Sequence, residues 1–156
     1  MCHPCKEANK TRVSMDFGQR YYSDNPAEAA IFQKAGLWGK PHLGIDFAPL
    51  QEFKPQEFVI VAPVAGNVIR AGFAPDYGYH VRIVDEQGRL HILAHLKTAP
   101  LVRMGAQVQE GQDLGWMGST GNSSGRHLHY EVRSTAVLPP PPKCRIDPNP
   151  ICFEEA

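Results

Sequence analysis

The chain has 156 residues, enough for one domain with its own hydrophobic core. Its 16 basic residues balance 16 acidic ones, and this neutral formal charge argues against a nucleic-acid-binding protein, which usually carries a basic excess. No apolar run approaches the roughly 20 residues that a membrane span requires. The first residues lack the apolar core of a signal peptide, so we expect either synthesis in the cytosol or prior removal of an export signal.

The N-terminal part of the chain is predicted to form a short strand followed by one helix. Residues 11–17 alternate loosely and end at a glycine, which is consistent with a strand. The run Ser23-Asp24-Asn25-Pro26 is a typical helix start, and Gly36 marks the stop, so we expect a helix from about Pro26 to Lys34. Its apolar residues 29–32 would supply the buried face.

Short strands with frequent glycine and proline turns dominate the rest of the chain. The polar, glycine-rich loop 119–125 leads into a further strand at His127, and the four prolines at 139–142 predict a stiff surface segment. The composition favours a mainly β fold, an antiparallel β-sheet domain with an open substrate groove and one peripheral N-terminal helix. Extended segments are expected at 58–61, 67–70, 79–85, 90–96, 102–111 and 112–117, with 79–96 forming a hairpin.

The segment Arg-His-Leu-His-Tyr-Glu at 126–131 carries the strongest chemical signal. His127 and His129 would leave one face of a strand roughly 6–7 Å apart, so one imidazole can hold a metal while the other reaches a molecule bound to that metal. His42, Asp46 and His95 supply further groups upstream. Together they provide the parts of a hydrolytic zinc site: three ligands, an open position for water, and spare imidazoles.

The spacing of His42 and Asp46 restricts the local conformation. In a flat strand their roots would lie roughly 13 Å apart, too far to share a zinc ion with bonds of about 2 Å. Gly44 and the flanking prolines argue against a helix, so we expect a curled segment in which Gly44 allows the bend. Alone, such a pair would indicate a surface hydrogen bond.

His91 and His95 also lie four residues apart. No glutamate follows His91, so the H-E-x-x-H helix of many metalloproteases is absent. The surrounding β pattern predicts a strand with both histidines on one face, where either one could be an ordinary strand residue.

Four motifs in order resemble the M23 family of zinc metallopeptidases, the lysostaphin- or LytM-type peptidoglycan endopeptidases. The resemblance covers about residues 17–148, and it implies a single domain with short extensions at both ends. The motifs are His42-Leu43-Gly44-Ile45-Asp46-Phe47-Ala48-Pro49, Ala94-His95-Leu96, Gly118-Ser119-Thr120-Gly121 and His127-Leu128-His129-Tyr130-Glu131-Val132.

The resemblance implies a role for each matching residue. His42, Asp46 and His129 would bind one zinc ion, and His95 and His127 would be the catalytic histidines beside the zinc-activated water. The implied reaction is hydrolysis of a peptide bond in bacterial peptidoglycan. The alternative is a catalytically silent module that binds or regulates cell-wall amidases, for which loss of a ligand would be the sign. All three ligands are present, so we favour the enzyme.

The implied substrate places the activity at the cell wall, in the periplasm or outside the cell. With no signal peptide in this chain, release in the manner of a phage lysin, or a shortened form of a secreted bacterial protein, would explain such a location. No nucleic-acid partner is expected, and the oligomeric state is left open.

Several residues depart from the family pattern or lie beside it. His91 and His80 stand where the family often has threonine and asparagine, and residues 51–57 lengthen the loop after Asp46, which would reshape one wall of the groove. Glu131 would point to the side of the strand that holds His129; a salt bridge or a solvated surface carboxylate is favoured over support of that ligand.

Two further groups stay outside the predicted site. Tyr77 and Tyr79 lie in a glycine-rich turn, where either could touch a reaction intermediate or cap the hairpin. The four cysteines are read as unpaired thiols or a disulfide that ties down the termini, in preference to a redox or structural zinc motif. They are Cys2, Cys5, Cys144 and Cys152.

Overall fold

The computed structural model describes residues 2–54, 56–134 and 145–146. The mainly β prediction is confirmed, and the predicted polyproline segment and the last two cysteines lie outside the described residues. The elements in chain order are η1 (Ala8–Lys10), β1 (Thr11–Met15), α1 (Pro26–Lys34), β2 (Ile45–Pro49), η2 (Gln51–Phe53), β3 (Val59–Val61), β4 (Gly66–Ala74), β5 (Gly78–Val84), β6 (Arg89–Leu96), β7 (Gln107–Val108), β8 (Asp113–Trp116), β9 (Leu128–Ser134) and β10 (Arg145–Ile146).

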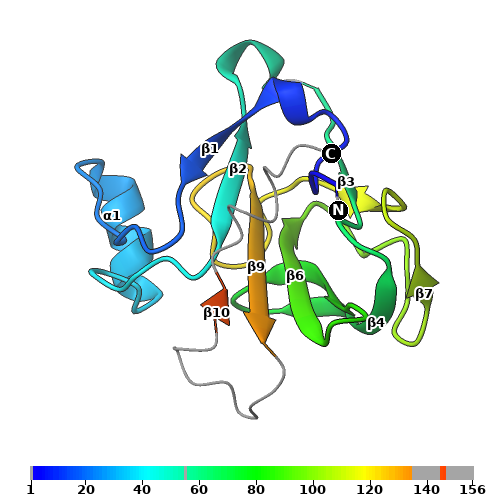
Figure 1. The fold of residues 1–156 in the computed structure, drawn as a ribbon. Helices are drawn as coiled ribbons and strands as arrows, with labels where there is room; N and C mark the ends of the chain where they lie inside the picture. The colour runs from blue at the N-terminus through cyan, green and yellow to red at the C-terminus, as the bar shows by residue number, and fades with distance from the viewer. Residues whose placement is uncertain (1, 55, 135–144, 147–156) are drawn as a thin grey trace.

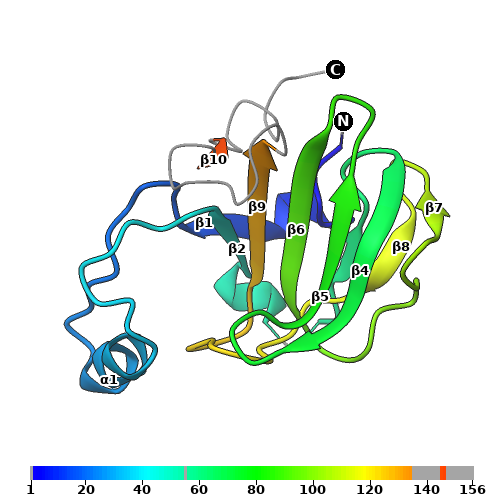
Figure 2. The same ribbon diagram turned by 90° about the horizontal axis from the view of Figure 1, so that it is seen from below.

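Antiparallel pairing joins most strands into one twisted sheet. Its order is β1-β2-β9-β6-β5-β4-β7, and β10 pairs with the far end of β9 (Figures 1 and 2). β3 and β8 form a separate two-stranded ribbon. The strand predicted near 58–61 thus pairs with β8, while the strand that follows it in the chain, β4, pairs with β5. The strands that carry the candidate site, β2, β9 and β6, lie side by side.

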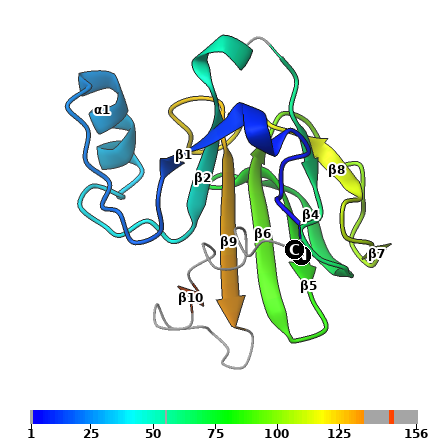
Figure 3. The ribbon, with the colours of Figure 1, turned by 45° about the horizontal axis from the view of Figure 1, so that its top comes forward.

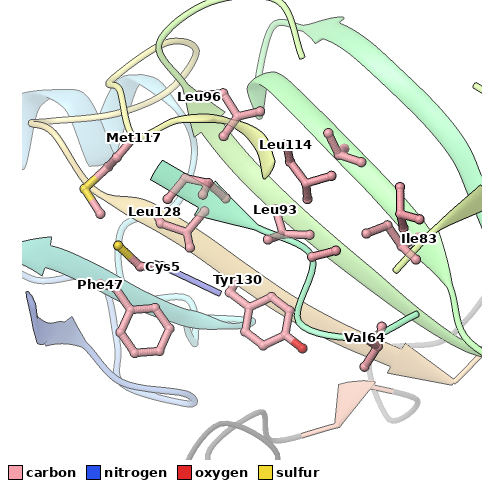
Figure 4. Close-up of a cluster of buried hydrophobic side chains, with 14 of the residues drawn as sticks. Cys5, Phe47, Val64, Ile83, Leu93, Leu96, Leu114, Met117, Leu128 and Tyr130 are labelled. Carbon is pink, nitrogen blue, oxygen red and sulfur yellow. The ribbon is translucent and has the colours of Figure 1, made fainter. Parts of the chain in front are cut away.

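The hydrophobic core fills the space between the main sheet and the β3–β8 ribbon. Phe47 from β2, Leu93 from β6, Leu114 from β8 and Tyr130 from β9 converge there and are each at most 1% exposed (Figure 4). Burying each such side chain stabilises the fold by roughly 1.5–3 kcal/mol. Because alternate residues of a strand face opposite sides, the neighbours of these residues point to the other face of the sheet.

The helix α1 has the predicted bounds, with the Asn25 side chain accepting hydrogen bonds from the backbone of Ala27 and Glu28 and Pro26 in the first turn. The prediction of a buried face is wrong, because no residue of α1 is buried. The helix stands beside the sheet rather than on it (Figure 1). Its main aromatic contact joins Phe32 to Tyr21, edge to face, with ring centroids 5.1 Å apart. The peripheral position is as predicted.

None of the helices in the described ranges combines the length and apolar character needed to span a bilayer.

Candidate metal centre and active site

The pairing of β2 with β9 places Asp46 directly opposite His129. Directly opposed residues of an antiparallel pair share a face, and Tyr130 and Phe47 beside them point into the core, so Asp46 and His129 face away from it. His42 precedes β2 and reaches the same place. Gly44 lies at the crossing, where a β-carbon would sit 2.2 Å from the Tyr130 carbonyl oxygen. The chain bends at Gly44 as predicted, and the glycine is also required for the close approach of the two backbones.

The structure brings His42, Asp46 and His129 together as three buried groups. Asp46 Oδ1 lies 3.1 Å from His42 Nε2 and 2.7 Å from His129 Nδ1, and the two nitrogens are 3.0 Å apart. A tetrahedral zinc site with bonds of about 2.0–2.1 Å has ligand atoms roughly 3.3 Å apart. The two nitrogens and one carboxylate oxygen thus fit a zinc ion with only small outward movements.

The hydrogen bonds behind these ligands orient them for a metal. The other nitrogen of His42, Nδ1, donates to the Asp16 carbonyl at 3.0 Å, which leaves a lone pair on Nε2 facing the centre. His129 Nε2 donates to Glu131 Oε1 at 3.0 Å, which directs Nδ1 inward. Such contacts with a carbonyl or carboxylate fix the tautomer of metal-binding histidines. The donor set and its support therefore both fit zinc.

Glu131 is buried, which contradicts the prediction of a solvated carboxylate, while the predicted salt bridge is present. Its Oε2 accepts from Arg133 Nε at 2.8 Å, and its Oε1 accepts from the Tyr77 hydroxyl at 2.7 Å as well as from His129. Burial alone would raise the pKa of Glu131, but the hydrogen bond and charge of His129 outweigh it and lower the pKa to about 2. Tyr77 thus supports this carboxylate, and does not face the groove.

Without a metal, His129 is held between two carboxylates. Burial opposes its protonation, but the hydrogen bonds and charges of Asp46 and Glu131 prevail and raise the pKa of His129 to about 10. Burial would also raise the pKa of Asp46, yet its hydrogen bonds with His129 and His42 hold that pKa far below the usual range. The proton on His129 therefore supplies positive charge between the two carboxylates when no metal is bound.

A β-bulge aims His95 at the same centre. The register of β5 with β6 changes from Val81↔Leu93 to Tyr79↔Leu96, so β6 carries one extra residue. His95 has φ +62°, and no other non-glycine residue in the described ranges has a positive φ. Bulges redirect side chains beside active sites. The prediction that His91 and His95 share a face is wrong, since the bulge sends them to opposite sides.

The two candidate catalytic histidines lie close together beside the metal centre. Their ring centroids are 4.7 Å apart. His95 Nδ1 donates to the Thr120 carbonyl at 2.7 Å, and His127 Nδ1 donates to the Gly125 carbonyl at 2.8 Å. Nε2 of each ring is therefore left free at the groove. His127 Nε2 lies 3.6 Å from Asp46 Oδ2. Burial, reinforced by charge on His127 and His129, lowers the pKa of His95 to about 3.

An open groove of about 830 Å³ passes over these side chains. On one side, Glu28 of α1 accepts a hydrogen bond from Ser124 at 3.0 Å, which ties the helix to the loop before His127. On the other, Arg126 donates to the carbonyls of Lys54 and Gln56 and so braces the lengthened loop after β2. Other lining residues are Arg12, Ser14, Met15, Gln19, Tyr21, Tyr22, Asn25, Phe32, Leu37, Asp46, Ala48, Pro49, Asn122, Gly125 and the three histidines 95, 127 and 129.

The two histidines set apart in the sequence lie outside the groove. His91 is fully buried, with Nδ1 2.7 Å from the Tyr130 hydroxyl and Nε2 3.0 Å from Asp85 Oδ2. His80 is buried beyond the bulge; its Nδ1 donates to the Gly78 carbonyl, while Nε2 has no partner among the described residues. Both therefore serve the fold and not the candidate site.

The N-terminal cysteines are also remote from the metal centre. Cys5 is buried in the core cluster and Cys2 is half-buried, and both are thiols. Burial raises the pKa of Cys5 to about 12, so this thiol is protonated and unreactive at neutral pH. Cys144 and Cys152 lie outside the described residues.

A His, Asp, His donor set with two further imidazoles in an open groove is typical of metal-dependent hydrolases. Residues 40–140 match the model of peptidase family M23, and the chain belongs to that family. The family is zinc-dependent.

Two curated relatives represent different activities. The chain is 33% identical over 123 residues, 79% of its length, to the DD-carboxypeptidase/endopeptidase Mpg of Neisseria meningitidis serogroup B (strain ATCC 13091 / M2091), of which it covers 24%. It is 38% identical over 109 residues, 69% of its length, to the murein hydrolase activator NlpD of Escherichia coli (strain K12), of which it covers 27%. The chain thus spans about a quarter of the length of either relative.

Solved structures share the fold. The catalytic domain of lysostaphin from Staphylococcus simulans matches with a TM-score of 0.71 at 23% identity, covering 95% of this chain and 96% of that domain. A chain of the SpoIIQ–SpoIIIAH pore-forming complex matches with a TM-score of 0.73 at 23% identity, covering 97% of this chain and 89% of the other. At this identity the likeness establishes the lysostaphin-like fold alone, which confirms the predicted fold class.

Proposed function

We propose that this chain is a zinc-dependent endopeptidase that hydrolyses peptide bonds in bacterial peptidoglycan, and that it acts at the cell wall. The observation that carries the proposal is the orientation of His42 and His129: each directs one ring nitrogen toward Asp46 because its other nitrogen is bonded elsewhere. In this proposal these three residues hold one zinc ion. When bound, zinc polarises the scissile carbonyl and lowers the pKa of a water molecule toward about 7.

The remaining histidines divide the proton transfers between them. Because His95 Nδ1 donates to the Thr120 carbonyl, its Nε2 is free to accept a proton beside the metal centre, so we assign it the role of general base. His127 Nε2 lies 3.6 Å from Asp46 Oδ2 at the edge of the metal centre, so we assign His127 to donate a hydrogen bond to the developing oxyanion and a proton to the leaving amine. The hydrogen bonds to the Thr120 and Gly125 carbonyls fix the orientation of the His95 and His127 rings.

The groove supports an extended peptide as the substrate. It is open, it runs across the ends of β1, β2 and β9, and the α1 and 51–57 segments bound it. Peptidoglycan is proposed because two relatives, Mpg and NlpD, carry peptidase and murein-related names.

Mass spectrometry of muropeptides after digestion of purified sacculi tests this proposal. The zinc-loaded protein should release new peptide termini, and His127→Ala should lose most of that activity. His80→Asn is the matched control, since it removes a buried histidine outside the groove, and it should digest sacculi at the wild-type rate. Absence of new termini with fully zinc-loaded wild-type protein would exclude the endopeptidase.

The similarity to NlpD favours a second candidate, a module that regulates cell-wall amidases without cleaving peptides itself. Under that function, sacculi would remain intact with this chain alone and would lose stem peptides faster when an amidase is added. The same digestion, performed with and without a purified amidase, distinguishes the two functions.

A further inference from the structure

A basic residue of β1 lies in line with the candidate active site. Arg12 pairs with Ala48, two residues beyond Asp46 on β2, so all three residues face the groove. Continuing the β2–β9 register past Phe47↔Leu128 puts His127 beside Ala48. With strands about 4.8 Å apart and about 3.4 Å between residues, the backbone of Arg12 lies roughly 8 Å from that of Asp46.

Most charged side chains in the groove already have partners. Asp46 is bonded to histidines, Glu28 to serines, and Arg126 to backbone carbonyls. Arg12 and Lys54, by contrast, are exposed, and neither side chain makes a hydrogen bond or ion pair within the described ranges. Among the described lining residues, the groove therefore offers two cations without side-chain partners, whereas its carboxylates, Glu28 and Asp46, already accept hydrogen bonds.

These two cations lie at the same end of the groove. The loop that carries Lys54 folds back against the start of β1, where Leu50 N donates to the Lys10 carbonyl and Lys10 Nζ donates to Gln56 Oε1 at 3.0 Å. The helix α1, with Glu28, lies at the other side of β2 (Figure 3). The groove is thus electrically asymmetric along the direction in which a peptide would extend.

We propose that Arg12, assisted by Lys54, binds a carboxylate of the peptide substrate. The proposal rests on the proposed function and adds to it a substrate class: peptides with a free carboxylate near the scissile bond. An extended peptide advances about 3.3–3.6 Å per residue, so two to three substrate residues span the roughly 8 Å between the backbones of Arg12 and Asp46. The planar guanidinium suits this task because it can bind both carboxylate oxygens at once.

The test uses cross-linked muropeptide dimers, either with free carboxylates or with those groups converted chemically to amides. The wild-type protein should cleave the free-acid dimer with a kcat/KM about 10- to 100-fold higher than that of the amide, as expected for charge-assisted hydrogen bonds. Arg12→Gln should bring this ratio close to one by lowering kcat/KM chiefly for the free-acid dimer. Lys54→Gln should reduce the ratio partly, and Arg12→Lys should retain part of it.

Arg103→Gln is the matched control, because Arg103 is an exposed cation that does not line the groove. It should keep the wild-type ratio, and melting temperatures should show that all variants fold. A wild-type ratio near one, or a ratio retained in Arg12→Gln, would overturn the proposal. If neither dimer is cleaved, the proposed endopeptidase function is wrong. The affinities of both dimers for the wild-type protein and for Arg12→Gln then test the proposed carboxylate-binding site separately.

Discussion

Replacing Glu131 by glutamine should make His129 much easier to deprotonate. In the metal-free protein, the ring is held by Asp46 at 2.7 Å and by Glu131 at 3.0 Å, and these contacts raise the pKa of His129 to about 10. The substitution keeps the size of the side chain but removes one of the two negative charges. The loss of a close opposite charge lowers the pKa of a histidine by about 1–3 units. We therefore expect His129 to titrate at about pH 7–9 in Glu131→Gln.

Nuclear magnetic resonance of the metal-free protein with 15N-labelled histidine measures this titration and also reports the tautomer. In the wild-type protein, the His129 signal should show the imidazolium form at pH 8, and in Glu131→Gln it should titrate at lower pH. The control is Glu57→Gln, which removes an exposed carboxylate that pairs with Lys97 and lies away from the centre. A wild-type His129 that titrates near the ordinary value of about 6.5, or a midpoint that Glu131→Gln leaves unchanged, would refute the reasoning.

The titration has a consequence for metal binding. A histidine must lose its proton before that nitrogen can bind zinc, so the zinc association constant of the wild-type protein should rise about tenfold per pH unit between pH 7.5 and 9. This rise should be shallower in Glu131→Gln. The variant also loses the carboxylate that orients His129, which weakens binding by about 10- to 100-fold once proton competition is absent.

Three further predictions follow from the positions of the other histidines. His129→Ala should lose most of the bound zinc by elemental analysis, whereas His95→Ala and His127→Ala should retain it and lose about 10²–10⁴-fold in turnover. His91→Thr should keep activity per folded molecule but reduce the free energy of unfolding in urea by about 1–3 kcal/mol, because buried polar partners lose a hydrogen bond. Burial lowers the pKa of His91, so the unfolded chain binds more protons, and stability should fall below about pH 6.5, less steeply in His91→Thr.

Each of these predictions has an outcome that would contradict it. Wild-type zinc content in His129→Ala would remove that residue from the ligand set. Loss of zinc in His95→Ala together with normal activity in His42→Ala would exchange the two roles. A drop in the turnover of folded His91→Thr as deep as that of His127→Ala would show that the active site extends through the sheet to His91.

The sequence allowed the main elements and the composition of the candidate site to be predicted. Residue periodicity and turn residues located α1 and the β5–β6 hairpin, and the ordered histidine motifs indicated which side chains would meet. Periodicity did not reveal the bulge before Leu96. One inserted residue changes the side of the sheet to which His95 points, but it does not change the apolar pattern. It also assigned α1 a buried face, since apolar residues in a helix do not indicate whether a sheet lies against them.

The burial of Glu131 could not be predicted from residue type. A glutamate on a strand normally faces water. Here the face opposite the core is itself covered, because Tyr77 and Arg133 close over the carboxylate. The available signal was the spacing of two residues from His129, which guarantees a shared face in a regular strand. The spacing alone does not predict burial of Glu131, because burial also depends on the neighbouring strands that cover this face.

The candidate centre depends on the core because both are built from the same strand. In β9, Leu128, Tyr130 and Val132 pack into the core while His129 and Glu131 point to the opposite face of the sheet, so shifting the ligand would require shifting the packed side chains. The segment that carries His42 packs against this strand at Gly44, where a β-carbon would sit 2.2 Å from the Tyr130 carbonyl oxygen, so there is no space for a side chain. The ligand separations near 3 Å are therefore set by core packing and the β2–β9 ladder. Within the described ranges, α1 contributes no buried residue and the 51–57 loop contributes only the partly buried Phe53 to the core, so most of these groove walls can differ in shape without disturbing the metal ligands.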